Sequence, residues 1–219
     1  MAIISIQITS DVICPWCYIG YRSLQRTIAL YKKTYPGGSK DDFRVTWKPY
    51  FIDQVEPDES ILIHDRMSRR MTGPQIEAAQ TRLKRVGQAL GIGFRFGGYI
   101  GSSRLGHRVL DFALREGTET QCRVAETLFK YQFELEKDVS QVEVVIEAAV
   151  EAGLEEKAVR EFLEKGGGKE EVESEAREAR DKGIHGVPHF MIGGQHHFDG
   201  AGEMEEFFNA FVRARAATG

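Results

Sequence analysis

The sequence predicts an α/β fold in which two strand-containing ends flank a long helical middle. Apolar residues alternate with polar ones near both ends, and they recur at steps of three and four between the ends. With 219 residues, of which 42% are hydrophobic, the chain can form one large domain or a small domain with a substantial insertion. We expect residues 1–70 and 183–219 to form one domain and residues 71–182 to form a helical insertion.

The N-terminal end predicts a strand–helix–strand unit. Ala2–Thr9 is rich in isoleucine and predicts a buried strand. Apolar residues at helical spacing follow over residues 21–31, and residues 43–47 alternate as a second strand. Because such crossovers are right-handed in nearly all proteins, we expect the two strands to lie parallel in one sheet.

From Gly73 to about Lys182, apolar residues recur at helical spacing, so we expect the middle of the chain to be helical throughout. Thr72 with Gln75, and Thr118 with Gln121, have the spacing of capping boxes, so a helix is expected to begin at each place. The highly charged run near the end of this block predicts a solvated helix face.

The C-terminal end predicts a hairpin followed by a helix. Val187–Ile192 has strand character, and Gly193-Gly194 is a tight-turn signal. Gln195–Phe198 would pair back, and Glu203–Arg213 would close the chain as an amphipathic helix.

Charge and hydropathy exclude several classes of function. The formal net charge is −4 and no basic stripe suggests nucleic-acid binding. No apolar run is long enough to span a bilayer. The first basic residue is Arg22, so Ala2–Ile8 lacks the positive flank of a secretory signal. These features predict a cytoplasmic protein in a reducing compartment.

Cys14-Pro15-Trp16-Cys17 follows the first strand and opens the first helix. A helix N-terminus favours a thiolate, which is the nucleophile of disulfide exchange. Pro15 stands where a missing N–H costs least. We expect Cys14 to be exposed and to attack, and Cys17, one turn into the helix, to resolve the mixed disulfide. The redox-active Cys14–Cys17 pair would then need no other bound cofactor.

The same two cysteines also fit half of a zinc site, or a pair of inert buried thiols. Cys122 is the third cysteine and stands alone, and the histidines near the C-terminus have no finger-like spacing. We therefore predict redox chemistry and no metal ligands.

Four segments together resemble a known superfamily. They are Ser10–Gly20 around the dithiol, Gly106–Leu110, Glu151–Leu154 and Gly183–Phe190. In this order, over nearly the whole chain, they are similar to the DsbA-like superfamily in its FrnE-like branch. The resemblance implies a thioredoxin fold with a large all-helical insertion. Kappa-class glutathione transferases and 2-hydroxychromene-2-carboxylate isomerases belong to the same superfamily. These relatives typically have serine in place of Cys14, so two cysteines favour thiol-disulfide chemistry.

The resemblance also implies a substrate site beside the dithiol. Pro188 would be a cis-proline facing the sulfurs, and the Val187 backbone would pair with an extended substrate. The residues alone do not predict a cis bond, and on their evidence Pro188 would simply begin an edge strand. Trp16 would contact substrate, pack over the disulfide, or do both. The expected site consists of catalytic Cys14 and Cys17 with substrate-binding Pro15, Trp16, Val187 and Pro188.

Two positions depart from the family pattern. DsbA has histidine where this chain has Trp16, so we expect a less oxidising couple than that of DsbA. FrnE-like chains often have asparagine a few residues before the His107-Arg108 pair, whereas this chain has Ser102-Ser103-Arg104.

For four other residues the sequence leaves two interpretations open. Cys122 is a buried structural thiol or a second redox centre. His107 lines the cleft or lies in the core, and His185 either acts on Cys14 or is simply solvated. Asp11 caps the helix or accepts a proton from Cys17.

The leading hypothesis is a thiol-disulfide oxidoreductase that oxidises, reduces or isomerises disulfides. Its partners would be protein or small-molecule disulfides and thiols, with glutathione or a thioredoxin-type protein as the reductant. An alternative is a glutathione-dependent transferase or isomerase of the kappa-class type, acting on a small aromatic, polyketide-like metabolite. A third is a chaperone-like or metal-stabilised binding protein. Monomer and homodimer both stay open.

Overall fold

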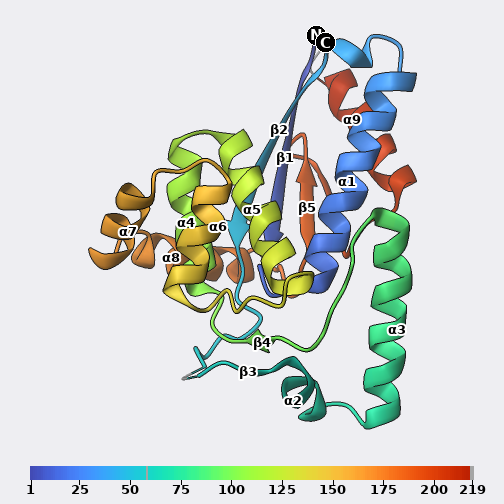
Figure 1. Ribbon diagram of the computed structural model, residues 1–219. Coiled ribbons are helices and arrows are strands. Elements are labelled where there is room, and N and C mark those ends of the chain that lie inside the picture. Colours follow the sequence, from blue (N-terminus) through green and yellow to red (C-terminus); the bar gives the residue numbers. More distant parts are fainter. Residues whose placement is uncertain (58, 218–219) are drawn as a thin grey trace.

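A computed structural model describes residues 1–57 and 59–217 (Figure 1). Its main sheet has four strands in the order β2-β1-β5-β6. β1 (Ile3–Ser10) runs parallel to β2 (Asp42–Pro49) and antiparallel to β5 (His189–Ile192). β6 (His196–Asp199) pairs antiparallel with β5. The predicted parallel pair and the predicted hairpin are both confirmed.

The centre of the sheet is the isoleucine-rich strand β1. Ile4, Ile6 and Ile8 are fully buried, because β1 has a neighbouring strand on each side and helices over its face. Ile6 lies opposite Val45 of β2 on one side and opposite Ile192 of β5 on the other. The register therefore places apolar residues of three strands side by side in the core.

Helices cover both faces of the sheet (Figure 1). α1 (Pro15–Thr34) and α9 (Met204–Ala217) lie on one face, where Phe207 of α9 packs edge-on against Phe190 of β5 with ring centroids 4.9 Å apart. α5 (Thr118–Phe133) and α8 (Lys169–Asp181) pack on β2 from the other face. This sandwich of helices around a mixed sheet holds the N-terminus of α1 in place.

Three more helices from the middle of the described chain pack beside these two. α4 (Arg104–Arg115), α6 (Val142–Glu151) and α7 (Glu156–Glu164) pack on one another, and α5 links α4 and α6 to the sheet. One continuous apolar core runs through both parts of the molecule. The division at residues 71 and 182 therefore stays a prediction. Within the described chain, no helix combines the length and apolarity needed to cross a membrane.

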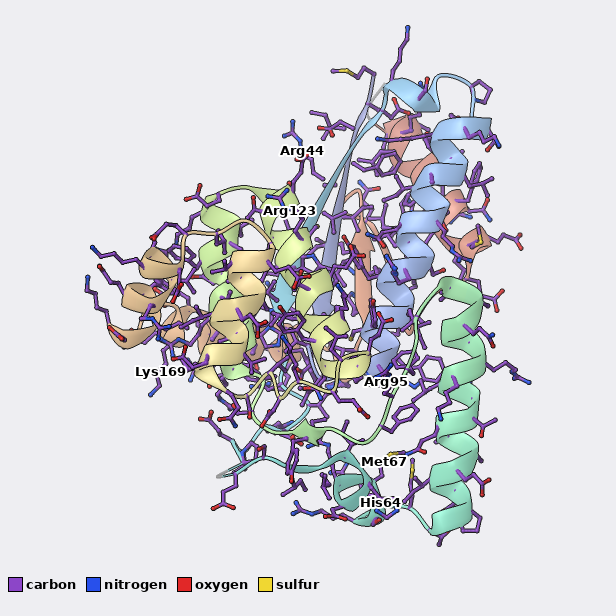
Figure 2. The ribbon with its side chains drawn as sticks, viewed as in Figure 1. Arg44, His64, Met67, Arg95, Arg123 and Lys169 are labelled. Atoms are coloured by element: carbon purple, nitrogen blue, oxygen red, sulfur yellow. The ribbon has the colours of Figure 1, made fainter. Side chains whose placement is uncertain are left out.

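The segment after β2 forms an arm that extends past the end of the sheet (Figure 1). It contains β3 (Ile61–Leu62), α2 (Ile63–Ser68), α3 (Gly73–Leu90) and β4 (Tyr99–Ile100). Figure 2 shows Met67 of α2 pointing toward α3, where Gln80 Nε2 lies 3.9 Å from its sulfur. A short 3₁₀ turn, η1 (Gly38–Lys40), lies before β2.

The expectation of an entirely helical middle is wrong at residues 91–103. There the chain is irregular except for β4, which pairs antiparallel with β3. The helix before it agrees with the prediction, because α3 begins after Thr72 and the Thr72 N–H donates to Gln75 Oε1 at 2.8 Å. Two-residue strands are too short to leave a clear alternation in the sequence.

The second expected capping box is also wrong. α5 begins at Thr118 without a side-chain cap, and Gln121 is buried against β2. Gln121 Oε1 accepts from the Trp47 N–H at 3.0 Å, and Gln121 Nε2 donates to the Trp47 carbonyl at 3.3 Å. Buried backbone groups on the outer side of β2 need partners, and the carboxamide supplies both.

Candidate active site

The two thiols lie at the N-terminus of α1. Cys14 is the residue that precedes the helix, Pro15 is at its start, and Cys17 lies in its first turn. The Cys14 N–H donates to the Asp11 carbonyl at 3.0 Å, and the Cys17 N–H donates to the Cys14 carbonyl at 3.1 Å. Both cysteines are free thiols, and the first turn of α1 contains no acidic residue. This end of the helix therefore favours negative charge on sulfur.

The two sulfurs differ in their surroundings, but less than the sequence predicted. Cys14 is only 5% exposed, so the expectation of an exposed nucleophile is wrong; a loop far away in the sequence packs over it. Cys17 is 0% exposed. Burial raises the pKa of the Cys17 thiol well above its usual value, and the neighbouring Cys14 raises it further. The Ser10 hydroxyl and the Asp11 backbone act in the opposite direction.

The loop over Cys14 contains Val187 and Pro188. The Val187–Pro188 peptide bond is cis, as the resemblance implied. The Val187 carbonyl oxygen lies 3.7 Å from Cys14 Sγ. Pro188 is buried, and its carbonyl accepts from the Gly200 N–H at 2.8 Å, which ties this loop to the end of β6. The loop is thus held beside the dithiol by the strands that flank it.

A groove of about 860 Å³ begins at this point and runs between α1, α3 and the loop before α9. Trp16 and Val187 border it near the dithiol. Its apolar surface comes from Ile19 of α1 and Val86 of α3, among others. The Arg82 guanidinium lies over the Trp16 ring, 4.9 Å from its centroid. Trp16 therefore both packs against α3 and faces the groove.

The groove has walls of opposite charge. Arg82 and Arg85 lie on the α3 side, and Glu203 and Glu206 lie on the α9 side. No carboxylate among residues 1–57 and 59–217 makes an ion pair with either arginine. Glu206 Oε2 accepts from the Glu203 N–H at 2.9 Å, so the Glu206 carboxylate also forms a hydrogen bond at the N-terminus of α9. The arginines are therefore available to a carboxylate of a bound molecule.

Behind the dithiol, Asp11 and His107 form a buried pair. Asp11 is 0% exposed and His107 is 3% exposed, with Asp11 Oδ1 and His107 Nε2 3.5 Å apart. The Asp11 carboxylate also accepts from the Ile13 N–H at 3.3 Å and the Ile52 N–H at 2.8 Å. Asp11 therefore organises the loop before α1 and joins it to α4, and it does not cap the helix. His107 lies in the core.

The other residues singled out in the sequence lie outside the groove. Cys122 lies against β2, where Trp47 Nε1 donates to its sulfur at 3.4 Å, and burial raises its pKa. His185 is exposed. On the β5–β6 hairpin, His189 Nδ1 lies 2.8 Å from Asp199 Oδ1. No group of three or more histidine, cysteine or acidic residues in the described part of the chain is arranged to hold a metal ion.

Some residues of this region were not predicted. Arg82 and Arg85 are three positions apart on a predicted helix, so a search for charged pairs on one helix face would have found them. Ser10 precedes the dithiol by four positions, but nothing in the local pattern marks its hydroxyl. The pairing of Asp11 with His107 joins residues almost one hundred positions apart and has no local signal.

Comparison with known proteins identifies the family. The DSBA-like thioredoxin domain family matches residues 5–212, and the chain belongs to it. Its fold is therefore the DsbA-like thioredoxin fold with a helical insertion, as the resemblance implied. No curated protein sequence matches the chain.

Three solved structures illustrate the similarity. A probable DsbA oxidoreductase from Streptomyces coelicolor is 26% identical, with a TM-score of 0.81 over 96% of this chain and 89% of that chain. A 2-hydroxychromene-2-carboxylate isomerase is 13% identical, with a TM-score of 0.68 over 95% of both chains. The cytosolic disulfide reductase DsbM from Pseudomonas aeruginosa, with GSH, is 14% identical, with a TM-score of 0.55 over 97% and 96%. The last two likenesses show the fold alone.

Proposed function

We propose that the protein is a thiol-disulfide oxidoreductase whose catalytic residues are Cys14 and Cys17. One observation carries this proposal: two free thiols share the N-terminus of α1, and the Cys14 sulfur lies 3.7 Å from the Val187 carbonyl. The 26% identical structure, described as a probable DsbA oxidoreductase, supports the same chemistry.

In the reductive direction, the Cys14 thiolate attacks one sulfur of a substrate disulfide. A Cys14–substrate disulfide forms, and the other substrate sulfur leaves as a thiolate that takes up a proton. Cys17 then loses its proton and attacks the Cys14 sulfur, which releases the second substrate thiol. The substrate has then gained two electrons and two protons, and the enzyme is left oxidised, with a Cys14–Cys17 disulfide. In the oxidative direction the same steps run backwards.

The groove beside Cys14 would position the substrate. Trp16 and Val187 border the groove, and the Val187 carbonyl lies near the Cys14 sulfur. In this proposal Pro15 and Pro188 also contact the substrate, and the Val187 backbone pairs with an extended segment of it. Arg82 and Arg85 would favour substrates with a carboxylate near the reacting sulfur. A peptide with an acidic residue close to its cysteine offers both an extended backbone for Val187 and a carboxylate for the arginines.

The reaction needs a second thiol or disulfide to return the enzyme to its starting state. Glutathione or a thioredoxin-type protein would serve, and the DsbM structure, described with GSH, supports glutathione as a co-substrate. We propose a cytoplasmic role and membership of the FrnE-like branch on the sequence features given above. No bound cofactor beyond the dithiol is required.

Single cysteine variants test this function. Cys14→Ser abolishes exchange with a substrate disulfide, whereas Cys17→Ser allows the first attack and accumulates a stable mixed disulfide. Cys122→Ser is the matched control and keeps both steps, because that sulfur lies against β2. Mass spectrometry of the protein after reaction with a peptide disulfide measures the adduct. Full exchange activity in Cys14→Ser would refute the proposal.

A glutathione-dependent transferase or isomerase is the second candidate. The groove favours it, since about 860 Å³ next to a thiol is large enough for a small aromatic molecule, and the isomerase shares the fold. Such an enzyme needs no resolving thiol. Undiminished turnover of an aromatic substrate with glutathione in Cys17→Ser would favour this function over disulfide exchange.

A further inference from the structure

The groove beside the dithiol has two charged walls that the protein itself leaves unpaired. The cationic wall consists of Arg82 and Arg85 of α3, and the acidic wall consists of Glu203 and Glu206 at the start of α9. All four residues are exposed, and none of them forms an ion pair within the described part of the chain. Charges of both signs are therefore available to a ligand that carries the complementary charges.

The cationic wall lies next to the dithiol. Trp16 stands between the two cysteines in the first turn of α1, and the Arg82 guanidinium lies 4.9 Å from the centroid of the Trp16 ring. Arg85 follows Arg82 by three positions, so the two side chains extend from the same side of α3. A substrate whose cysteine is bonded to Cys14 would therefore present a neighbouring residue to this wall.

The acidic wall lies farther along the groove. Trp16, Ile19 and Ser23 of α1 line the groove in turn, so the groove follows the helix away from Cys14. The Ser23 hydroxyl donates to the Gly202 carbonyl at 3.4 Å, which places the start of α9 at the level of Ser23. The helix rises about 10 Å between Trp16 and Ser23, and an extended chain covers that distance in about three residues. The two walls are thus separated by about three residues of an extended substrate.

The surface between the two walls is apolar. Ile19 of α1 and Val86 and Leu90 of α3 contribute to it. Arg26 of α1 donates to the Ala89 carbonyl, so α3 runs beside α1 in the same direction along the groove. Apolar side chains between the two charges of a substrate would be stabilised by burial against this surface.

We propose that the groove recognises an extended polypeptide segment that has an acidic residue next to its reactive cysteine and a basic residue about three positions beyond that acid. This inference rests on the proposed thiol-disulfide exchange and specifies its substrate class. The acid pairs with the cationic wall, and the base pairs with the acidic wall. Glutathione is the competing occupant, but it has no apolar side chain to cover the surface between the walls.

Two peptide isomers of equal composition and net charge test the proposal. Each contains one cysteine joined by a disulfide to an aromatic thiol that is coloured when it is released. In the matched isomer, glutamate is next to the cysteine and lysine is three positions beyond the glutamate, with apolar residues between them. In the swapped isomer the glutamate and the lysine exchange places. Both isomers are made with the charged residues before the cysteine and after it, so that either chain direction is tested.

The assay follows attack by the reduced protein. The Cys14 thiolate attacks the peptide sulfur, the Cys14–peptide bond forms, and the aromatic thiolate leaves as the disulfide of the substrate breaks. Each rate is divided by the rate of the same peptide with 2-mercaptoethanol, because nearby charges also change the intrinsic reactivity of a disulfide.

We expect the matched isomer to react about three- to thirtyfold faster than the swapped isomer in at least one chain direction. The matched isomer forms an exposed ion pair at each wall, whereas the swapped isomer brings like charges together. Added salt should reduce this preference, because the charges are exposed.

Variants of each wall identify its contribution. Glu203→Gln with Glu206→Gln removes about half of the preference on a logarithmic scale. It keeps the hydrogen bond at the start of α9, because a glutamine oxygen still accepts from the N–H of residue 203. Arg82→Gln with Arg85→Gln removes the other half. Glu205→Gln is the matched control and keeps the full preference, because Glu205 is exposed in the first turn of α9 and does not line the groove.

Each outcome separates this inference from the proposed function. Equal corrected rates for the two isomers in both chain directions, or a faster swapped isomer, overturn the inference and leave the proposed function unaffected. A preference that neutralising either wall does not change also overturns it. A glutathione mixed disulfide that reacts faster than every peptide assigns the groove to glutathione instead. Release by the parent that is no faster than release by Cys14→Ser refutes the proposed function, and the inference fails with it. If a double variant does not fold, Glu203→Gln and Arg85→Gln alone decide the question.

Discussion

The carbonyl oxygen of Val187 lies 3.7 Å from the Cys14 sulfur, although 173 positions separate the two residues. Strand pairing produces this contact, because His189 of β5 lies opposite Thr9 of β1. A slip of one residue in that register would turn the side chains of β5 to the other face of the sheet. The site therefore depends on the pairing of β1 with the hairpin as much as on the dithiol motif.

Removing the cationic wall of the groove should weaken binding of acidic substrates. Arg82→Gln with Arg85→Gln is expected to raise KM for a peptide with glutamate beside its cysteine about two- to tenfold, with kcat nearly unchanged. Added salt should reduce the difference between variant and parent. Steady-state kinetics of disulfide exchange with acidic and with basic peptides measure KM for the variant and the parent.

Arg44→Gln is the matched control for this prediction. Arg44 is an exposed residue of β2, where Figure 2 shows it pointing into solvent, and its partner is Asp42 rather than a group of the groove. If the KM for the acidic peptide is the same in the double variant as in the parent, the arginines have no role in recognition.

The resolving step should accelerate strongly with pH. Burial raises the pKa of Cys17, so most of this thiol is protonated near neutral pH. Its rate should rise about tenfold per pH unit until the pH reaches that raised value, since only the thiolate attacks. Single-turnover decay of a mixed disulfide between pH 6 and about 9 measures this slope. A flat profile over that range would contradict a buried, protonated Cys17.

A methyl group at Gly106 should disturb the loop that leads to the dithiol. A Cβ at this position of α4 would lie 2.9 Å from a methyl carbon of Val12, two residues before Cys14. Gly106→Ala should therefore lower the free energy of unfolding by about 1–3 kcal/mol and slow attack by Cys14. Gly73→Ala is the control, because nothing lies within 4 Å of its added carbon and stability should be equal or slightly higher. Equal stability in the two variants would show that α4 does not press on the loop.

Asp41 should make the protein less stable in acid. Burial by itself would raise the pKa of Asp41, but hydrogen bonds from the Ala2 N–H, Tyr31 and Arg215 outweigh it and lower the pKa. A lowered pKa contributes stability that is complete above the unfolded value of about 4 and is lost as the pH falls below it.

Asp41→Asn should cost about 2 kcal/mol at pH 7 and less at pH 3, because protonation has already removed part of the contribution in the parent. Urea unfolding at both pH values measures the change. Asp42→Asn, at an exposed neighbour, should change stability by less than about 0.5 kcal/mol. An Asp41→Asn effect that is equal at both pH values would show that the carboxylate is not the origin of the acid sensitivity.

Local patterns predicted those parts of the fold that depend on neighbouring residues. The isoleucine run predicted β1, the Gly193-Gly194 turn predicted the hairpin, and the dithiol motif predicted the start of α1. Contacts between distant segments left no such signal. The burial of Cys14 depends on a loop more than 170 positions away. Gln121 has capping-box spacing, but β2 offered its carboxamide two buried partners, and tertiary contact outweighed the local preference.

The carboxamide of Gln121 also has a consequence for how copies of this protein meet. β2 is an outer strand of the sheet, and such strands invite edge-to-edge aggregation through their unpaired peptide groups. An incoming strand would need the N–H and carbonyl of Trp47, and Gln121 already occupies both. Gln121 thus protects this edge strand against pairing with a strand of another molecule. Replacing Gln121 with leucine would leave the Trp47 N–H and carbonyl without these hydrogen bonds.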